Sequence, residues 1–321
     1  MGTSARDAHP SAWHAPVVIT LDVESRGLRG LDDFWPVRDF LASLYPITPA
    51  GTVWDVRRWD GSIWHSDPPG LAPERAERSR LWVTPGGRVV AAAMNEGGRQ
   101  IHPHVHPAFG NLLAEVIAWS EGAATTAGDD RVLLHVWSHD EATRRVAVER
   151  GYLESDGCEV LRSLRLRRAV ALPAPAVPDG YAVRTTGSET DHQAIADLLN
   201  AAFGRTFHTA VDLANFASRA PSFRRDLDLV AEAPDRTLAA YAAVCWDSCN
   251  RRAIFEPVCT HPAHRQRGLA KALMLEGMWR ARDRGARVID VGTGDMDPAN
   301  VLYASLPFGE VYRGRYWEKA L

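Results

Sequence analysis

The sequence predicts an α/β protein built from two similar domains in tandem. Strand-like and helix-like patterns alternate along its 321 residues, a length at which one large or two ordinary domains are expected. Landmarks recur at a spacing of about 150 residues, which suits duplicated domains: Val105-His106-Pro107 corresponds to Thr260-His261-Pro262, and Trp119 to Trp279. Between the copies, residues 169–180 (AVALPAPAVPDG) are rich in proline and alanine and predict an interdomain linker.

The composition is that of a globular protein with real cores, since 45% of the residues are hydrophobic. The formal net charge is −3, which does not suggest a nucleic-acid partner. We see neither an apolar run of the ~20 residues that a membrane span needs nor a signal peptide. The four cysteines show no zinc or redox spacing and predict free thiols. We therefore expect a cytoplasmic protein without a membrane partner, as a monomer or homodimer.

In the first copy, residues 1–16 predict a flexible arm. Asp60-Gly61 and Pro85-Gly86-Gly87 are turn sequences and predict hairpins over residues 51–66 and 80–93. Apolar residues at helical spacing, each run stopped by proline or glycine, predict helices over 31–44, 112–122 and 140–150. Apolar and β-branched runs predict the remaining strands over 17–23, 101–106, 132–137 and 160–168.

The second copy begins with a predicted strand over 181–185. Ser188 as a cap, apolar residues at helical spacing and Gly204 predict a helix between them. Similar patterns predict helices over 208–218, 269–284 and 300–306. Strands are predicted over 228–233, 237–245, 252–260, 287–291 and 310–318.

A strand, a glycine-containing turn and a helix follow one another at residues 252–284. The turn reads Arg265-Gln266-Arg267-Gly268-Leu269-Ala270. At a helix N-terminus, backbone N–H groups without an intrahelical partner and the positive end of the helix dipole favour a bound anion. Gly268 allows a close approach of the backbone, and the small Ala270 keeps the helix near the anion. The pattern therefore predicts a pyrophosphate-binding turn.

These six residues match the (Arg/Gln)-x-x-Gly-x-(Gly/Ala) signature of the GNAT superfamily of N-acetyltransferases. Downstream, Leu302-Tyr303-Ala304-Ser305-Leu306-Pro307-Phe308 resembles that family's Leu-Tyr-x-x-x-Gly-Phe, with Pro307 in place of glycine. The resemblance covers roughly residues 181–321. It implies α/β (α+β) domains, each a mixed, mostly antiparallel twisted sheet flanked by helices, and acetyl-CoA as co-substrate without a metal.

The resemblance also implies roles for individual residues. The turn Arg265–Ala270 would hold the pyrophosphate, and the backbone of Val258, Cys259 and Thr260 would pair with the pantetheine arm and polarise the thioester carbonyl. Tyr303 would protonate the leaving thiolate. Asn300, one helical turn earlier, would bind the pantetheine amide or cap its own helix. Cys259 is interpreted as a small buried hydrophobe because transfer in this family is direct.

Glu256 lies in an otherwise apolar strand, two residues before Val258 and therefore on the same face. An amine with a pKa of ~8–10 must lose a proton before it attacks, so a carboxylate here could serve as the base. Alternatively, Glu256 binds the substrate electrostatically or pairs with an arginine.

The first copy, residues 17–168, lacks the residues that would carry chemistry. Fewer residues separate His106-Pro107 from Trp119 than separate His261-Pro262 from Trp279, and the phosphate-turn signature is missing. Ala147 stands where the second copy has Tyr303. We therefore expect a degenerate first domain, a catalytic domain over 181–321, and one CoA per chain.

Three other features of the first copy have competing interpretations. His102, His104 and His106 alternate and share a face, which suits a metal, a substrate or an interface; the adjacent prolines and the missing carboxylate pattern favour packing. The eight tryptophans before residue 140 are interpreted as core and domain interface rather than an aromatic platform. Four arginines near the end of the first copy are interpreted as the solvated face of a closing strand: Arg162, Arg165, Arg167 and Arg168.

The resemblance therefore implies transfer of an acetyl group to a primary amine of a small molecule, by direct attack in a ternary complex. Three alternatives stay open: a non-catalytic acyl-CoA-binding or interaction protein, a protein N-terminal acetyltransferase, and an enzyme like the mycothiol synthases, which share the tandem architecture. Residues 292–300 (GTGDMDPAN) do not resemble the last family.

Overall fold

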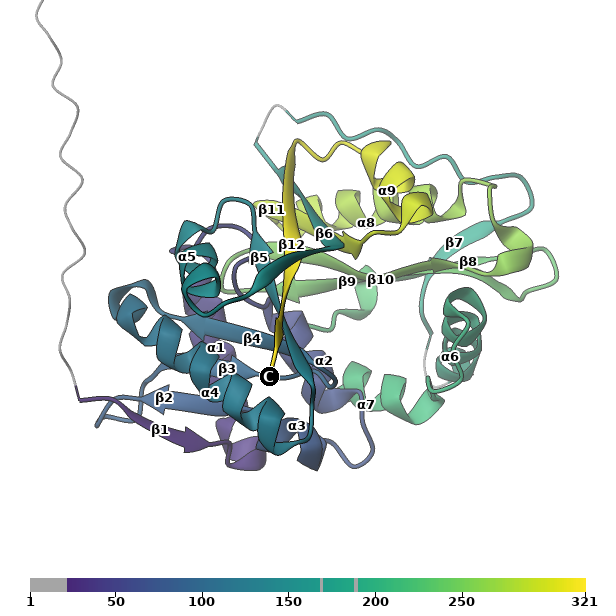
Figure 1. Cartoon of the computed structure of the whole chain (residues 1–321). Helices are drawn as coiled ribbons and strands as arrows, with labels where there is room; N and C mark the ends of the chain where they lie inside the picture. The colour runs from purple at the N-terminus through teal and green to yellow at the C-terminus, as the bar shows by residue number, and fades with distance from the viewer. Residues whose placement is uncertain (1–21, 168–169, 188–189) are drawn as a thin grey trace, which may run out of the picture.

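The computed structural model describes residues 22–167, 170–187 and 190–321. Within these ranges one continuous sheet of 12 strands runs through the whole molecule, in the order β1-β2-β3-β4-β5-β12-β6-β11-β10-β9-β8-β7 (Figure 1). The β4–β5 and β10–β11 pairs are parallel and all other neighbours are antiparallel. The predicted arm 1–16, most of the strand 17–23 and the cap Ser188 lie outside the described residues.

The first half supplies six strands and five α-helices within the described residues. The strands are β1 (Glu24–Gly27), β2 (Arg80–Val83), β3 (Val89–Met94), β4 (Gln100–Val105), β5 (Arg131–Trp137) and β6 (Leu153–Arg165). The helices are α1 (Phe34–Leu44), α2 (Val56–Trp64), α3 (Pro73–Glu77), α4 (Leu113–Thr126) and α5 (Glu141–Glu149), with short 3₁₀ turns at Gly30–Asp33 and Pro107–Leu112.

The second half repeats this order. Its strands are β7 (Ala182–Thr185), β8 (Asp228–Glu232), β9 (Leu238–Asp247), β10 (Arg252–Thr260), β11 (Val288–Gly294) and β12 (Glu310–Ala320). Its helices are α6 (Thr190–Phe203), α7 (Ala210–Arg219), α8 (Leu269–Asp283) and α9 (Asp297–Ala304), with 3₁₀ turns at Arg225–Leu227 and Pro262–His264. None of the helices in the described ranges has the length and apolar character needed to cross a bilayer.

The last strands of the two halves are exchanged. β6 pairs with β11 of the second half, β12 pairs with β5 of the first half, and β6 and β12 pair with each other (Figure 1). Each half therefore completes its sheet with a strand from the other half. The predicted limits at residues 168 and 181 mark the repeat along the chain; as limits of independent folding units they stay a prediction.

In both halves a parallel pair of strands diverges partway along its length. The β10–β11 pairing ends at Phe255↔Val291, and a register shift in β10 follows between Phe255 and Val258. The β4–β5 pairing ends at Ile101↔Leu134. Beyond these points the inner edges of the strands no longer pair with each other, so the backbone there is available to something else.

Helices cover both faces of the sheet. In the second half, α8 packs on one face through Leu273, Met274 and Met278, and α6 packs on the other through Ile195, Leu198 and Leu199. In the first half, α4 lies on one face, and α1 and α2 lie on the other around the fully buried Trp59. The interpretation of the early tryptophans as core and domain interface agrees with the burial of Trp59 and Trp82, whereas Trp35 is 54% exposed.

The predicted hairpin over residues 51–66 is wrong. Residues Val56–Trp64 form helix α2, because Asp55 caps it by accepting a hydrogen bond from the Arg58 backbone N–H at 2.8 Å. Trp59 and Ile63, one turn apart, are both buried against α1. A short alternating run fits a strand and a helix almost equally well, and Asp60-Gly61 does not turn the chain.

The interpretation of Arg162 as solvated is also wrong. Its side chain is buried, with 6% of the residue exposed, and its Nη1 donates to Asn300 Oδ1 at 2.8 Å. β6 is not an edge strand, because β12 and β11 flank it. Arg165, on the same strand, is exposed and pairs with Glu310 as expected for a surface residue.

A buried ion pair of the second half contacts two residues of the first half, Ser163 and Tyr45. Arg252 of β10 donates to Asp290 of β11, which also accepts a hydrogen bond from Ser163 of β6. The Arg252 guanidinium lies 4.3 Å from the ring centre of Tyr45, at the end of α1. Arg252 and Asp290 are 6% and 2% exposed, so removal of either charge leaves the other unpaired in the interior.

We expect Asp290→Ala to lower the free energy of unfolding by about 3–5 kcal/mol, because the buried guanidinium loses its partner. Chemical denaturation measures this change. The matched control is Asp130→Ala, which breaks an exposed pair with Arg99 and should change stability little. Equal effects of the two substitutions would contradict a structural role for the buried pair.

Candidate active site between the two halves

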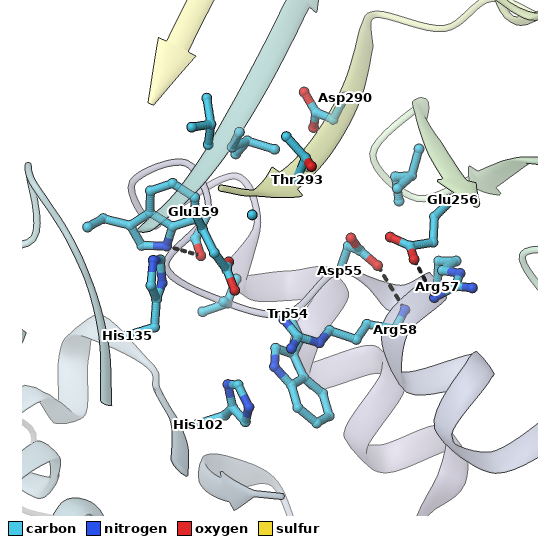
Figure 2. A pocket seen from close by; sticks show the side chains of 18 of the residues that line it. Trp54, Asp55, Arg57, Arg58, His102, His135, Glu159, Glu256, Asp290 and Thr293 are labelled. Carbon is cyan, nitrogen blue, oxygen red and sulfur yellow. Dashed lines mark hydrogen bonds and ion pairs between the residues drawn. The ribbon is translucent and has the colours of Figure 1, made fainter. Parts of the chain in front are cut away.

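A cavity of about 470 Å³ lies where the two halves meet, on the side of the sheet that α2 faces (Figure 2). The second half lines it with Glu256, Pro257, Val258, Thr293 and Tyr303. The first half lines it with residues from the α1–α2 loop, α2, β4, β5 and β6, including Trp54, Asp55, Arg57, Arg58, His102, His104, His135 and Glu159. The volume is in the range of small-molecule sites, ~300–1,000 Å³.

The strand segment Val258–Thr260 borders the opening between β10 and β11. On one edge it pairs with β9, through Val258↔Ala242 and Thr260↔Ala240. On the other edge the pairing with β11 has already ended, at Phe255↔Val291. Val258 also lines the cavity. An extended chain can therefore lie along this edge and reach the cavity; pairing of pantetheine there, which the family resemblance implies, stays a prediction.

Cys259 points away from the cavity. It is 6% exposed and packs with Leu199 of α6 and with Tyr241. Burial raises the pKa of its thiol to about 12, so little reactive thiolate exists at neutral pH. This environment supports the interpretation of Cys259 as a buried hydrophobe.

The turn Arg265–Ala270 leads into the N-terminus of α8. Gln266 and Gly268 adopt positive φ angles of 59° and 81°, and the first helical hydrogen bond runs from the Ala272 N–H to the Gly268 carbonyl at 3.0 Å. The N–H groups of residues 269–271 consequently have no intrahelical partner. Residues 265–268 are exposed, and a Cβ on Gly268 would meet nothing within 4 Å. This exposed cradle fits a pyrophosphate.

The two arginines of the turn differ. Arg265 Nη2 donates to the Ala202 carbonyl of α6 at 2.8 Å, which ties the turn to that helix. Arg267 is exposed and has no ion pair among the described residues. Of the two, Arg267 is the better placed to add positive charge beside a bound phosphate.

Tyr303 is on α9 and lines the cavity. It is 6% exposed and belongs to the core cluster that includes Leu306 and, partly buried, Val258. Burial, and then the charge of Glu256, raise the pKa of its phenol to about 12. The hydroxyl is therefore protonated throughout the neutral range, as an acid or hydrogen-bond donor must be.

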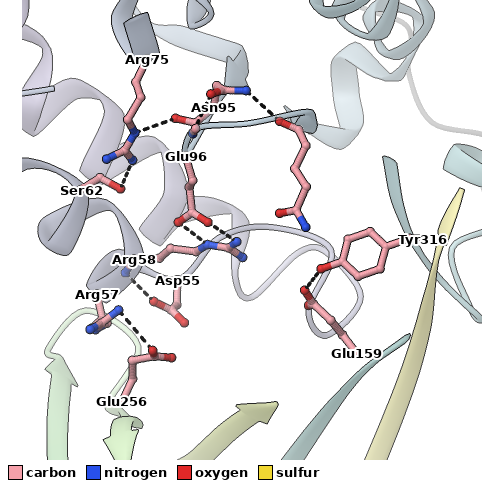
Figure 3. A network of polar contacts seen from close by, with 12 residues as sticks. Asp55, Arg57, Arg58, Ser62, Arg75, Asn95, Glu96, Glu159, Glu256 and Tyr316 are labelled. Atoms are coloured by element: carbon pink, nitrogen blue, oxygen red, sulfur yellow. Dashed lines mark hydrogen bonds and ion pairs between the residues drawn. The ribbon is translucent and has the colours of Figure 1, made fainter. Parts of the chain in front are cut away.

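Glu256 faces a residue of the first half that the sequence did not single out. Its carboxylate lies 3.6 Å from Arg57 Nη1 on α2 (Figures 2 and 3). The Glu256 side chain is 50% exposed and that of Arg57 is 17% exposed. The pairing matches one of the alternatives predicted for Glu256, and it leaves the carboxylate accessible from the cavity.

The Asn300 side chain bonds to one arginine and to two backbone carbonyls. Its Oδ1 accepts from Arg162 at 2.8 Å, and its Nδ2 donates to the carbonyls of Gly294 at 3.1 Å and Met296 at 3.2 Å. Asn300 thus holds the connection between β11 and α9, which carries Tyr303. Contact between Asn300 and pantetheine stays a prediction.

Two further polar pairs of the cavity were missed by the sequence reasoning. Arg58 donates to both carboxylate oxygens of Glu96, with Nε at 2.6 Å, and Tyr316 donates to Glu159 (Figure 3). Because residues 51–66 were predicted to form a hairpin, we did not predict that Arg58 and its helical neighbours face the cavity together. Tyr316 is on β12, and only the strand exchange brings it to the first half.

The histidines of β4 are divided between two environments. His102 and His104 are buried and line the cavity, whereas the Nδ1 of His106 accepts from the Ala108 N–H at 3.1 Å and starts the following turn. His102 and His104 both pack beside the Trp54 ring, and because they also line the cavity a substrate-facing role stays a prediction. Among the described residues no group of three His, Cys, Asp or Glu side chains could hold a metal ion.

Comparisons with known proteins agree with this geometry. Residues 192–306 match the model of the acetyltransferase (GNAT) family. A GCN5-related N-acetyltransferase from Sphaerobacter thermophilus is 21% identical, with a TM-score of 0.61, and the match covers 94% of this chain and 97% of that one. A tandem GNAT protein from the clavulanic acid biosynthesis pathway is 19% identical, with a TM-score of 0.65, over 93% of this chain and 98% of that one.

These solved structures are too distant in sequence to show more than the fold. No curated protein matches the sequence. The mixed, mostly antiparallel sheet with helices on both faces, in tandem, is confirmed as the fold of the chain.

Proposed function

Because the second half of this chain belongs to the acetyltransferase (GNAT) family and the whole chain has the tandem GNAT fold, we propose that it transfers an acetyl group from acetyl-CoA to a primary amine of a small molecule. One observation carries the proposal. Val258 and Tyr303 line the cavity between the halves, and from Val258 the unpaired edge of β10 leads along the chain to the exposed turn before α8.

The chain's residues would divide the work of direct transfer in a ternary complex. The N–H groups at the start of α8 and Arg267 bind the pyrophosphate, and the β10 edge orients the pantetheine arm and donates a backbone N–H to the thioester oxygen. Holding both substrates in one cavity supplies much of the rate through proximity.

Two proton movements would accompany the transfer. Glu256, directly or through water, accepts a proton from the incoming ammonium, and its ion pair with Arg57 fixes the carboxylate at the cavity wall. Tyr303 donates a hydrogen bond, and then its proton, to the sulfur as the carbon–sulfur bond breaks. The proton that the attacking nitrogen loses on becoming an amide restores the phenol through solvent. A phenol with a pKa of about 12 is a weak acid, so donation would accompany the build-up of charge on sulfur rather than precede it.

The charge of the cavity favours an amine over an anionic acceptor. Its lining includes more carboxylates than guanidiniums: Asp55, Glu96, Asp140, Glu159, Glu256 and Asp290 against Arg57, Arg58 and Arg252. An excess of negative charge attracts an ammonium group. Because both halves of the protein wall the cavity, it has room for a small molecule rather than for the end of a protein chain.

The test is thiol release from acetyl-CoA in the presence of a panel of small amines, with mass spectrometry of the products. We expect acetylated product from at least one small amine and no release without an acceptor. Acetyl-CoA binding without turnover on any amine would favour the non-catalytic alternative. Turnover only on peptides with a free N-terminus would favour a protein N-terminal acetyltransferase.

A further inference from the structure

The first half supplies the cavity with a group of nitrogen-bearing aromatic side chains, which we name the histidine–tryptophan cluster: Trp54, His102, His104 and His135. The Trp54 ring centre lies 5.0 Å from that of His102 and 5.4 Å from that of His104. Figure 2 shows Trp54, His102 and His135 around a common open space. These residues belong to the α1–α2 loop, β4 and β5, so separate elements converge there.

The cluster lies where the strands of the first half diverge. Parallel pairing of β4 with β5 ends at Ile101↔Leu134, and the three histidines follow directly after that point. The corresponding opening in the second half leads to the proposed acyl-transfer site. In the first half, imidazole side chains occupy the walls of the opening instead.

Five of the seven ring nitrogens of the cluster have no hydrogen-bond partner within the described residues. The unpartnered atoms are Trp54 Nε1, His102 Nε2, both ring nitrogens of His104, and His135 Nε2. Trp54, His102 and His104 are only 5%, 8% and 3% exposed. Leaving buried polar atoms unpaired is destabilising, so each such atom needs a bound water, ion or ligand as its partner. Since these residues line the cavity, their free nitrogens point to a bound polar molecule.

The histidines are neutral at physiological pH. Burial, followed by the nearby Arg58 guanidinium, holds the pKa of His102 well below its usual value and lowers that of His104 to about 3. Burial also lowers the pKa of His135. A neutral imidazole offers one donor and one acceptor, and the Trp54 indole offers a donor only.

This mixture of donors and acceptors discriminates among ligand groups. A carboxylate or phosphate needs donors alone and would enter a cavity already rich in carboxylates. An ammonium needs acceptors alone, which Trp54 cannot supply, and the Arg58 guanidinium lies 4.9 Å from the Trp54 ring centre. A hydroxyl both donates and accepts, so it suits either tautomer of each histidine.

We propose that the histidine–tryptophan cluster binds the uncharged, polyhydroxylated part of the acceptor, such as a sugar or cyclitol ring, while the amine of the same molecule lies toward Glu256. The aromatic faces of the cluster pack against the C–H groups of such a ring, and the free nitrogens bond to its hydroxyls. The proposal rests on the proposed amine acetylation for the role of the ligand, but binding of the polyol itself is independent of turnover.

The kinetic test compares amines with and without hydroxyl groups: glucosamine and 2-deoxystreptamine against cyclohexylamine and benzylamine. We expect kcat/KM to be at least ~10-fold higher for the hydroxylated amines, because unpaired polar groups of a site reject an analogue that lacks hydroxyls. Trp54→Phe and His104→Phe should lower kcat/KM at least ~10-fold for the hydroxylated amines, through KM, and change it less than ~2-fold for cyclohexylamine. Trp35→Phe, at an exposed tryptophan, is the matched control and should change neither.

A binding test separates this proposal from the proposed function. Calorimetric titration of the unmodified protein with myo-inositol and glucosamine should show binding that Trp54→Phe and His104→Phe weaken at least ~10-fold. Cluster-dependent binding of these probes without acetylation of any amine would overturn the proposed function and support the polyol site. Acetylation of cyclohexylamine as efficient as that of glucosamine, unaffected by the cluster variants, would overturn the polyol site and keep the function.

The variants must be shown to fold, and the structure makes a specific prediction for one of them. His104→Phe removes two unpaired buried nitrogens, so its melting temperature should equal or exceed that of the wild type. A folded His104→Phe variant with undiminished binding of myo-inositol would overturn the proposal.

Discussion

Replacement of Tyr303 by phenylalanine is expected to lower kcat for amine acetylation by about 10²–10⁴-fold, because the leaving thiolate loses its proton donor. Affinity for acetyl-CoA should change little, since the aromatic ring stays within its core cluster. Steady-state kinetics at varied acetyl-CoA concentration separate the effect on kcat from the effect on acetyl-CoA affinity. Tyr152→Phe is the matched control: this tyrosine is equally buried, at 2% exposure, but is absent from the cavity wall.

The pH dependence gives a second measurement of the same assignment. Because the pKa of Tyr303 is raised to about 12, its hydroxyl keeps the proton throughout the range in which amines become neutral, ~8–10. We therefore expect kcat/KM to rise with pH up to at least pH 10 without a fall caused by the tyrosine. Full activity of Tyr303→Phe, or a loss of activity near pH 10 in the wild type that this substitution removes, would contradict the assignment.

Substitution of Gly268 by aspartate is expected to weaken acetyl-CoA binding by at least ~100-fold. The new carboxylate would stand at the N-terminus of α8, where its charge repels the pyrophosphate and its side chain fills the space that the phosphate needs. The backbone contributes too, because a side chain at a φ of 81° costs about 1–2 kcal/mol. Calorimetric titration with acetyl-CoA measures the loss of affinity.

The chain offers a close control for the backbone effect. Gly151, after α5 in the first half, also has a φ of 81°, and a Cβ there meets nothing within 4 Å. Gly151→Asp therefore introduces the same strain and charge away from the turn. Equal losses of acetyl-CoA affinity in the two variants would show that Gly268 acts through general destabilisation and not through the phosphate-binding turn.

Most elements were predictable because their signals are local. The helix over 269–284 and the strand over 252–260 follow from apolar periodicity, and the structure has them at Leu269–Asp283 and Arg252–Thr260. The turn before α8 was predictable because a glycine at positive φ before a helix leaves a sequence signature; its binding of a phosphate stays a prediction. The error at residues 51–66 shows the limit of such reasoning: tertiary contacts of Trp59 and Ile63 with α1 decide for a helix where periodicity is ambiguous.

The sequence alone determined the tandem repeat, the turn Arg265–Ala270 and the positions of Tyr303 and Glu256, because each depends on the order of residues within a short segment. The tertiary structure decided the partners of those residues. The exchange of β6 and β12 buries Arg162 beside Asn300 and brings Tyr316 to Glu159, and the contact between the halves places Arg57 beside Glu256. These contacts join residues far apart in the chain, and only long-range strand pairing and packing bring them together.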